Sequence, residues 1–233
     1  MLASRRLATL SLGLALLAPL GLAGGCSSDS GSGGFRITQP QPVHSTAPVP
    51  DSPENLLRLL EWCYANRDLE TYRTLFTEDF RFVFATLDPN GNAYRSIPWI
   101  REDEIESFAH LVNGGDANQP RAQSITLMLD RNFRVTDDPR PGMMPTWHRM
   151  IRTSATLRIV ADPSQWEIQG FANFFMVRGD SAAIPPDLKA RGFGPDPQRW
   201  YIQRWEDDTS PPEGARAMPT SKSTWGSIKA IYR

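Results

Sequence analysis

The sequence predicts an α+β domain in which three helices pack on a strongly bent antiparallel sheet. Apolar residues recur at helical spacing over 53–76 and 101–113, and at every second residue in four segments after residue 124. The prolines beyond residue 119 fall between those four segments and never within them. This distribution favours strands, because proline cannot donate a hydrogen bond to a sheet ladder.

The helices are predicted by their end signals as well as by their periodicity. Ser52 suits the N-cap of the first helix and Pro53 its first position, and Asp68 suits the N-cap of a short second helix. The third helix is expected over 101–113. Its acidic run, Glu102–Glu106, is interpreted as a solvated helix start, since acids suit the positive N-terminal end of a helix.

One strand is expected before the third helix and four after it. In the first, Phe80, Phe82 and Phe84 should share a face. The short connection "ADPSQ" between two of the later segments favours antiparallel pairing. The second half of 165–177 is apolar on both faces, so both faces of this strand are expected to be buried. The protein interior would bury one face, and a homodimer interface would bury the other. The expected strands are 79–87, 124–135, 149–160, 165–177 and 199–207.

This order of elements resembles the nuclear transport factor 2-like superfamily, also called SnoaL-like, a cystatin-like α+β cone. The opening segment 52–84 and the closing "WYIQRWEDD" carry the resemblance. It implies a bent sheet wrapped on helices around a conical hollow that would hold any ligand. The superfamily includes ketosteroid isomerases, scytalone dehydratases, limonene epoxide hydrolases and many members without catalysis. These share no motif, so the resemblance assigns no catalytic residue.

The N-terminus predicts export. Arg5 and Arg6 precede an uncharged apolar run, and residues 1–25 are typical of a signal peptide. Pro19 and several glycines interrupt the run, which disfavours a membrane-spanning helix. "LAGGC", ending at Cys26, resembles the lipobox of bacterial lipoproteins, although Ala23 stands where that family prefers a larger aliphatic residue. The resemblance implies cleavage before Cys26 and a lipid anchor on its thiol; plain secretion is the alternative.

The predicted organisation therefore has three parts: a signal peptide over 1–25, a lipidated cysteine and flexible tether over 26–51, and one domain over 52–233. The tether is rich in Ser, Gly, Pro and Thr, so it cannot bury enough apolar surface to order itself. The predicted location is the bacterial cell envelope, outside the cytoplasm, with the chain anchored to a membrane by its lipid.

Composition excludes several classes of function. The chain has 25 Lys+Arg and 26 Asp+Glu; cleavage before Cys26 removes two arginines, which leaves 23 against 26, or −3. Such a balance argues against a nucleic-acid partner, which needs a concentrated positive face. No clustered metal ligands and no phosphate-loop, HExxH or GxSxG motif occur, so neither a metal nor a cofactor is expected. Cys63 should be an inert core residue on an apolar helix face.

Five residues are predicted as ligand-binding candidates in the cone: Asn173, Tyr201, Gln203, Trp205 and His148. Tyr201, Gln203 and Trp205 alternate along one segment and should share a face. His148 is a candidate general base near neutral pH, or a partly exposed histidine at a strand end. No catalytic residue is assigned. The predicted function is a lipid-anchored module that binds a small apolar molecule or acts as a scaffold. The alternatives are an acid–base isomerase, dehydratase or hydrolase, and a structural, oligomerising module.

Overall fold

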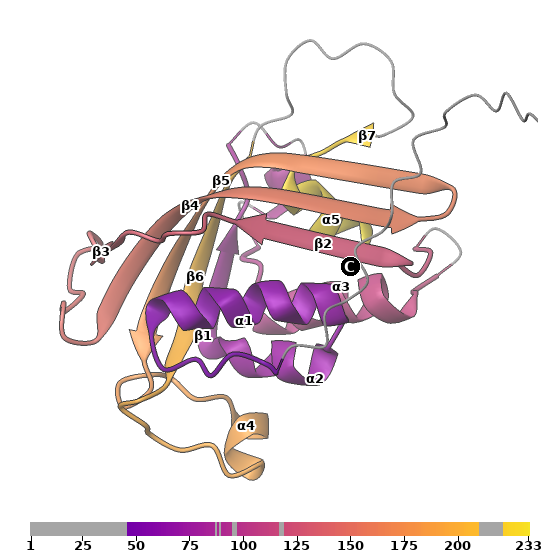
Figure 1. Cartoon of the computed structure of the whole chain (residues 1–233). Helices are drawn as coiled ribbons and strands as arrows, with labels where there is room; N and C mark the ends of the chain where they lie inside the picture. Colours follow the sequence, from indigo (N-terminus) through magenta and orange to yellow (C-terminus); the bar gives the residue numbers. More distant parts are fainter. Residues whose placement is uncertain (1–45, 87, 89, 95–96, 117–118, 210–220) are drawn as a thin grey trace, which may run out of the picture. The chain divides into compact units, whose positions relative to one another are not determined.

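The computed structural model describes residues 46–233 apart from positions 87, 89, 95–96, 117–118 and 210–220, and the described residues belong to one folded unit (Figure 1). Its helices and helical turns are α1 (Pro53–Asn66), α2 (Leu69–Tyr72), η1 (Arg73–Leu75), η2 (Asn90–Tyr94), α3 (Arg101–Asn113), α4 (Pro186–Ala190) and α5 (Trp225–Ile231). Its strands are β1 (Phe76–Val83), β2 (Ser124–Leu129), β3 (Val135–Asp137), β4 (His148–Ala161), β5 (Ser164–Arg178), β6 (Trp200–Thr209) and β7 (Ser221–Lys222).

The two predicted caps are confirmed. The Ser52 hydroxyl accepts a hydrogen bond from the Asn55 amide at 3.2 Å, and α1 begins at Pro53. The Asp68 carboxylate accepts one from the Thr71 amide at 2.9 Å, and α2 follows. Each bond satisfies a backbone donor that the first helical turn leaves without an intrahelical partner, so these helices begin where the caps predict.

The sheet is mixed, which corrects the prediction of an antiparallel sheet in one respect. The strand order is β1-β6-β5-β4-β2, with β3 paired to β4 and β7 paired to β5. The four long strands predicted after residue 124 pair antiparallel, as expected. β1, however, lies parallel to β6, and β7 lies parallel to β5. A period-two pattern identifies a strand but carries no information about the direction of its partner.

The expected strand over 124–135 divides into β2 and β3, and its Asp130 explains the interruption. The Asp130 amide donates to the Thr153 hydroxyl at 3.0 Å, in place of a ladder partner. Its carboxylate accepts from the Ser154 amide at 2.8 Å and from the Thr153 and Ser154 hydroxyls. These hydrogen bonds, chiefly those from Ser154, lower the pKa of Asp130. The first strand ends at Val83, so Phe84 lies just beyond it.

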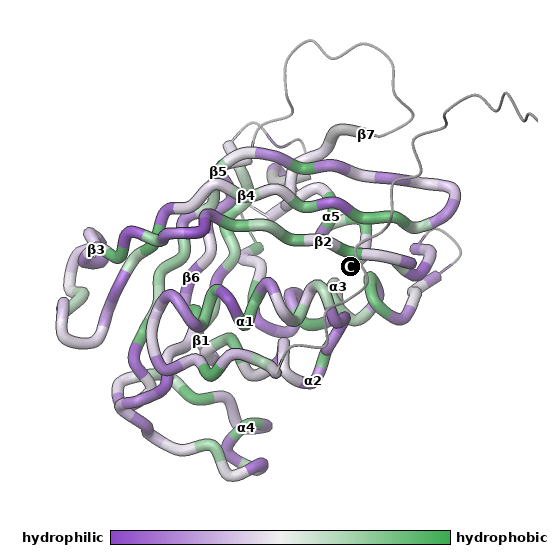
Figure 2. The backbone as a smooth tube through the Cα atoms, in the orientation of Figure 1, coloured by the Kyte–Doolittle hydropathy of each residue, from purple (hydrophilic) through white to green (hydrophobic). Residues whose placement is uncertain are grey.

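The sheet curves around α1 and α3, and this confirms the predicted α+β class with a strongly bent sheet (Figure 1). α1 packs on β2, β4 and β6, while α3 packs on β1. Hydrophobic and hydrophilic residues alternate along β4, because one face of the strand meets the helices (Figure 2). Fully buried side chains from both layers form the main core, among them Leu56, Leu60, Phe80, Phe174 and Trp205.

A second, smaller core covers the opposite, outer face of the sheet at the ends of β5 and β6. Val177 and Tyr201 pack there with Ile184 and Leu188, from the segment that contains α4. The prediction that β5 is covered on both sides is therefore confirmed for its last residues, and the cover comes from this chain. The last residues of the predicted tether also contact the domain: Ala47 packs on the main core, and the Pro50 carbonyl accepts from the Trp200 amide at 2.9 Å.

Candidate functional site

The interior between the sheet and the helices is filled, largely by α5, which sequence analysis does not predict. α5 begins at Trp225, and the hydroxyl of its N-cap residue Thr224 accepts from the Ser227 amide at 2.9 Å. It places Trp225, Ile228 and Lys229 in the core. One cavity beside these side chains has a volume of about 10 Å³ and is lined by α1, α2, α3, β4 and α5. Such a volume accommodates about one water molecule, which is far too little for a substrate.

A buried ionic cluster lies beside this cavity. Glu104 of α3 pairs with Lys229 of α5, and its carboxylate also accepts from the Tyr72 hydroxyl at 2.5 Å and from the Trp99 indole at 3.0 Å. Burial lowers the pKa of Lys229, and the nearby charge of Glu104 opposes this shift. Burial and the same Glu104 charge raise the pKa of Tyr72 well above its ordinary value. The ion pair and the hydrogen bonds from Tyr72 and Trp99 compensate for the burial of the Glu104 charge. A charged pair is tolerated in a core only when it is paired and hydrogen-bonded in this way.

Asp207 of β6 holds the N-terminal end of α5. Its carboxylate accepts from the Gly226 amide at 2.8 Å and from the Thr209 amide and hydroxyl at 3.0 and 2.6 Å. Burial raises the pKa of Asp207 to about 6, and these hydrogen bonds oppose the rise. The two clusters fix both ends of α5, so the interior titratable groups are engaged in holding the fold together.

The five predicted site residues do not converge on one pocket. Trp205 lies in the main core, fully buried, whereas Tyr201 lies in the small core on the outer face. The prediction that Tyr201, Gln203 and Trp205 share a face is wrong for Trp205. The cause is a bulge: Met176 pairs with Ile202 and Phe175 with Arg204, so Gln203 is an extra residue and the alternation shifts by one.

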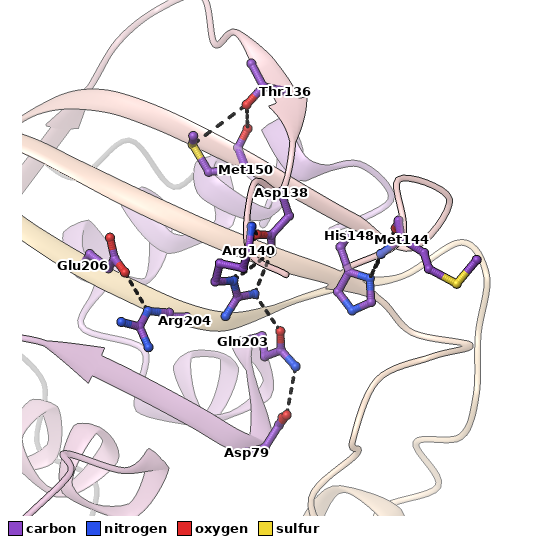
Figure 3. A network of polar contacts seen from close by, with 10 residues as sticks. All are labelled: Asp79, Thr136, Asp138, Arg140, Met144, His148, Met150, Gln203, Arg204 and Glu206. Atoms are coloured by element: carbon purple, nitrogen blue, oxygen red, sulfur yellow. Dashed lines mark hydrogen bonds and ion pairs between the residues drawn. The ribbon is translucent and has the colours of Figure 1, made fainter. Parts of the chain in front are cut away.

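Gln203 and His148 make separate sets of polar contacts on the outer face (Figure 3). The Gln203 amide oxygen accepts from the Arg140 guanidinium at 2.9 Å, and its nitrogen donates to Asp79 at 2.8 Å. Arg140 also pairs with the buried Asp138 at 2.6 Å. His148 contacts the backbone of Met144, with its Nδ1 atom 3.2 Å from the amide nitrogen. The side-chain amide of Gln203 and the Nδ1 atom of His148 therefore find partners within the protein.

Asn173 lies further along the outer face, where its side-chain oxygen accepts from Arg152 at 3.2 Å. The same arginine pairs with Asp208 at 2.7 Å and covers the ring of Phe171. Phe171 is nevertheless 47 % exposed, whereas Phe175 is buried beneath Arg140. Along this part of β5, Phe171 is thus the one phenylalanine that is exposed on the outer face.

An open hollow of about 430 Å³ lies at the β1 edge of the sheet. Arg81 of β1 and Arg204 of β6 line it, and they are register partners in the parallel pair. Phe84 and Tyr94 form part of the wall, with their rings stacked at 4.7 Å between centroids and 8° between planes. The remaining lining residues are Phe82, Val83, Ala85 and Pro98. A hollow of this size, mostly apolar with a few polar groups, is suited to a small molecule.

Sequence analysis missed the residues that define the buried ionic cluster and the hollow at the β1 edge. The acidic run was expected to be solvated, but Glu104 is 1 % exposed and Asp103 8 %. The signal for Glu104 was its position, four residues after Ile100 and one before Ile105, on the helix face toward the core. Arg81 carried a clearer signal, because it alternates with three phenylalanines that face inward. Across the described part of the chain, no three His, Cys, Asp or Glu side chains are grouped as metal ligands.

The predicted signal peptide, Cys26 and the tether up to residue 45 lie outside the described residues. Within the described ranges, no helix is both long and apolar enough to cross a membrane.

Comparison with known proteins gives fold neighbours at low similarity. No family model matches the chain, and no curated protein matches it. A conserved protein from Planctomyces limnophilus has 13 % identity and a TM-score of 0.44, over 67 % of this chain and 92 % of its own. A protein of unknown function from Mycobacterium tuberculosis has 12 % identity and a TM-score of 0.41, over 69 % and 70 %. A nuclear transport factor 2-like protein of unknown function in nutrient uptake, from Rhodospirillum rubrum, has 15 % identity and a TM-score of 0.39, over 67 % and 93 %.

Proposed function

We propose that this protein is a lipid-anchored small-molecule-binding protein of the bacterial cell envelope, with its ligand site in the hollow at the β1 edge. One observation carries the proposal: the hollow measures about 430 Å³, while the interior cavity measures about 10 Å³. The titratable groups of the interior pair with one another, which favours a binding role over acid–base chemistry in the cone. The ligand site thus differs from the one that the resemblance implied.

The binding proposal is tested by filling the hollow. Pro98 lines it and is exposed, so Pro98→Trp should occupy the hollow without disturbing the core. Pro195→Trp makes the same change at an exposed position of the segment between α4 and β6, away from the lining. In a thermal-shift screen of small apolar and steroid-like compounds, hits should stabilise the parent and Pro195→Trp but not Pro98→Trp. A screen in which no compound raises the midpoint of the parent would remove the binding proposal.

The anchor is supported by the N-terminal sequence alone: two arginines, an uncharged apolar run and "LAGGC". Each buried methylene of an acyl chain contributes about 0.8 kcal/mol, so two or more chains hold a protein stably on a membrane. Expressed with its own signal in a bacterium, the protein should incorporate labelled fatty acid and partition into detergent. Cys26→Ser should lose both properties; equal labelling of parent and variant contradicts the anchor.

A homodimer through the outer face of the sheet stays a prediction. Phe171 is the exposed apolar residue that such an interface would bury, with Met128 exposed on the neighbouring region of β2. This arrangement would also serve the scaffolding function that was predicted beside ligand binding.

A further inference from the structure

Two arginines stand side by side in the hollow at the β1 edge. Arg81 and Arg204 are direct register partners on neighbouring strands, and both line the hollow. Two like charges held close together on paired strands repel each other. A pair of this kind is therefore retained at a cost to the fold, unless an anion comes to lie between the two guanidinium groups.

The described residues balance one of these two charges. Arg204 donates through Nε to Glu206 at 2.7 Å. Arg81 donates through one terminal nitrogen to the Phe80 carbonyl at 2.6 Å, and it makes no ion pair with any residue that the structure describes. Both side chains are half-buried, so water screens them incompletely. Counted over the described residues, the lining of the hollow therefore carries a surplus of one positive charge.

The rest of the lining is apolar and partly flat. Phe84 and Tyr94 stack in parallel, and Val83, Ala85 and Pro98 extend the apolar wall. The Arg233 guanidinium lies 5.3 Å from the centroid of the Tyr94 ring, and Asp103 balances its charge in an ion pair at 2.7 Å, so the surplus stays at one. A ligand that suits this lining has one anionic end for the arginines and a flat, apolar body for the aromatic wall.

We propose that the hollow binds a small monocarboxylate with a flat apolar body, such as an aromatic acid, with its carboxylate held between Arg81 and Arg204. This inference rests on the proposed function and adds the class of ligand. Guanidinium groups match a carboxylate because they offer parallel N–H donors in a fixed plane. One negative charge equals the surplus in the hollow, which favours a monocarboxylate over a dianionic phosphate.

The test compares 1-naphthoate with 1-naphthamide, which has the same ring system and no charge. Isothermal titration with the full chain should give naphthoate at least about tenfold tighter binding than naphthamide, since hydrogen bonds to charged groups are the stronger ones. Arg81→Gln and Arg204→Gln should each weaken naphthoate binding about tenfold and leave naphthamide binding nearly unchanged. Arg158→Gln removes an exposed arginine of β4 that does not line the hollow, and it should change neither.

The outcomes separate this inference from the proposed function. If both probes bind the parent equally and Pro98→Trp removes both, the hollow is a ligand site but the assignment of a carboxylate is overturned. If neither probe binds and the compound screen is also negative, the inference and the proposed function fall together. If phenyl phosphate binds more tightly than naphthoate, the ligand class is a phosphate and the inference as stated is wrong.

Discussion

Replacing Lys229 by methionine tests whether the ionic cluster holds α5 in the interior. Lys229 is 4 % exposed, and its amine pairs with Glu104 and lies 4.1 Å from the centroid of the Trp205 ring. Methionine fills a similar volume but leaves the carboxylate without its cation. Removing one partner of a buried ion pair typically costs about 3–5 kcal/mol. Glu104 keeps the hydrogen bonds from Tyr72 and Trp99, so we expect a loss near 3 kcal/mol.

Urea unfolding followed by tryptophan fluorescence measures this loss. Lys189→Met is the matched control, because Lys189 is exposed on α4, and it should change the free energy of unfolding by less than about 0.5 kcal/mol. Adding Glu104→Gln to Lys229→Met removes the uncompensated charge and should restore part of the stability. The reasoning fails if Lys229→Met costs no more than Lys189→Met, or if the double variant is less stable than Lys229→Met alone.

Four further predictions concern other parts of the domain. Burial raises the pKa of Asp207 from 3.8 to about 6, so this carboxyl group stays protonated to a higher pH in the folded state than in the unfolded chain. The free energy of unfolding should therefore fall by up to about 3 kcal/mol as pH rises from about 3 to 7, and Asp207→Asn should flatten that part of a pH series. Burial also raises the pKa of the Cys63 thiol, so iodoacetamide should label it only after denaturation, as mass spectrometry would show. Gln203→Leu should destabilise the fold by about 1 kcal/mol, because two hydrogen bonds within the protein are lost; unchanged thermal stability would contradict this. Sedimentation at micromolar concentration should show a dimer that Phe171→Asp dissociates, and a monomeric parent would exclude the interface.

The elements that sequence reasoning found are those whose signals are local. The Ser52 and Asp68 caps stand next to the helices that they begin, and the four later strands each repeat their pattern over many residues. Such signals need only the residues within the element. The α+β class follows from them, because the order of helices and strands is itself a local property of the chain.

The missed features depend on partners that are distant in the sequence. β1 pairs with β6 across more than a hundred residues, and its hydrophobic pattern is the same in a parallel or an antiparallel pair. α5 spans seven residues, too few for a helical period to be distinguished from chance. Glu104 is buried because Lys229 neutralises it from a position 125 residues away. Without such a partner, acidic residues at a helix start are expected to be exposed to water.

The bulge at Gln203 shows how one unpaired residue relocates a candidate site. Without it, strict alternation would place Trp205 on the outer face with Tyr201 and Gln203. With it, Trp205 turns into the core, where it contacts Trp225 of α5 at 4.3 Å between ring centroids, and Arg204 turns to the outer face beside Arg81. The same extra residue therefore helps to close the interior and completes the pair of arginines at the β1 edge. If the binding proposal holds, the shift of the ligand site from the cone to the edge of the sheet follows from this bulge together with α5.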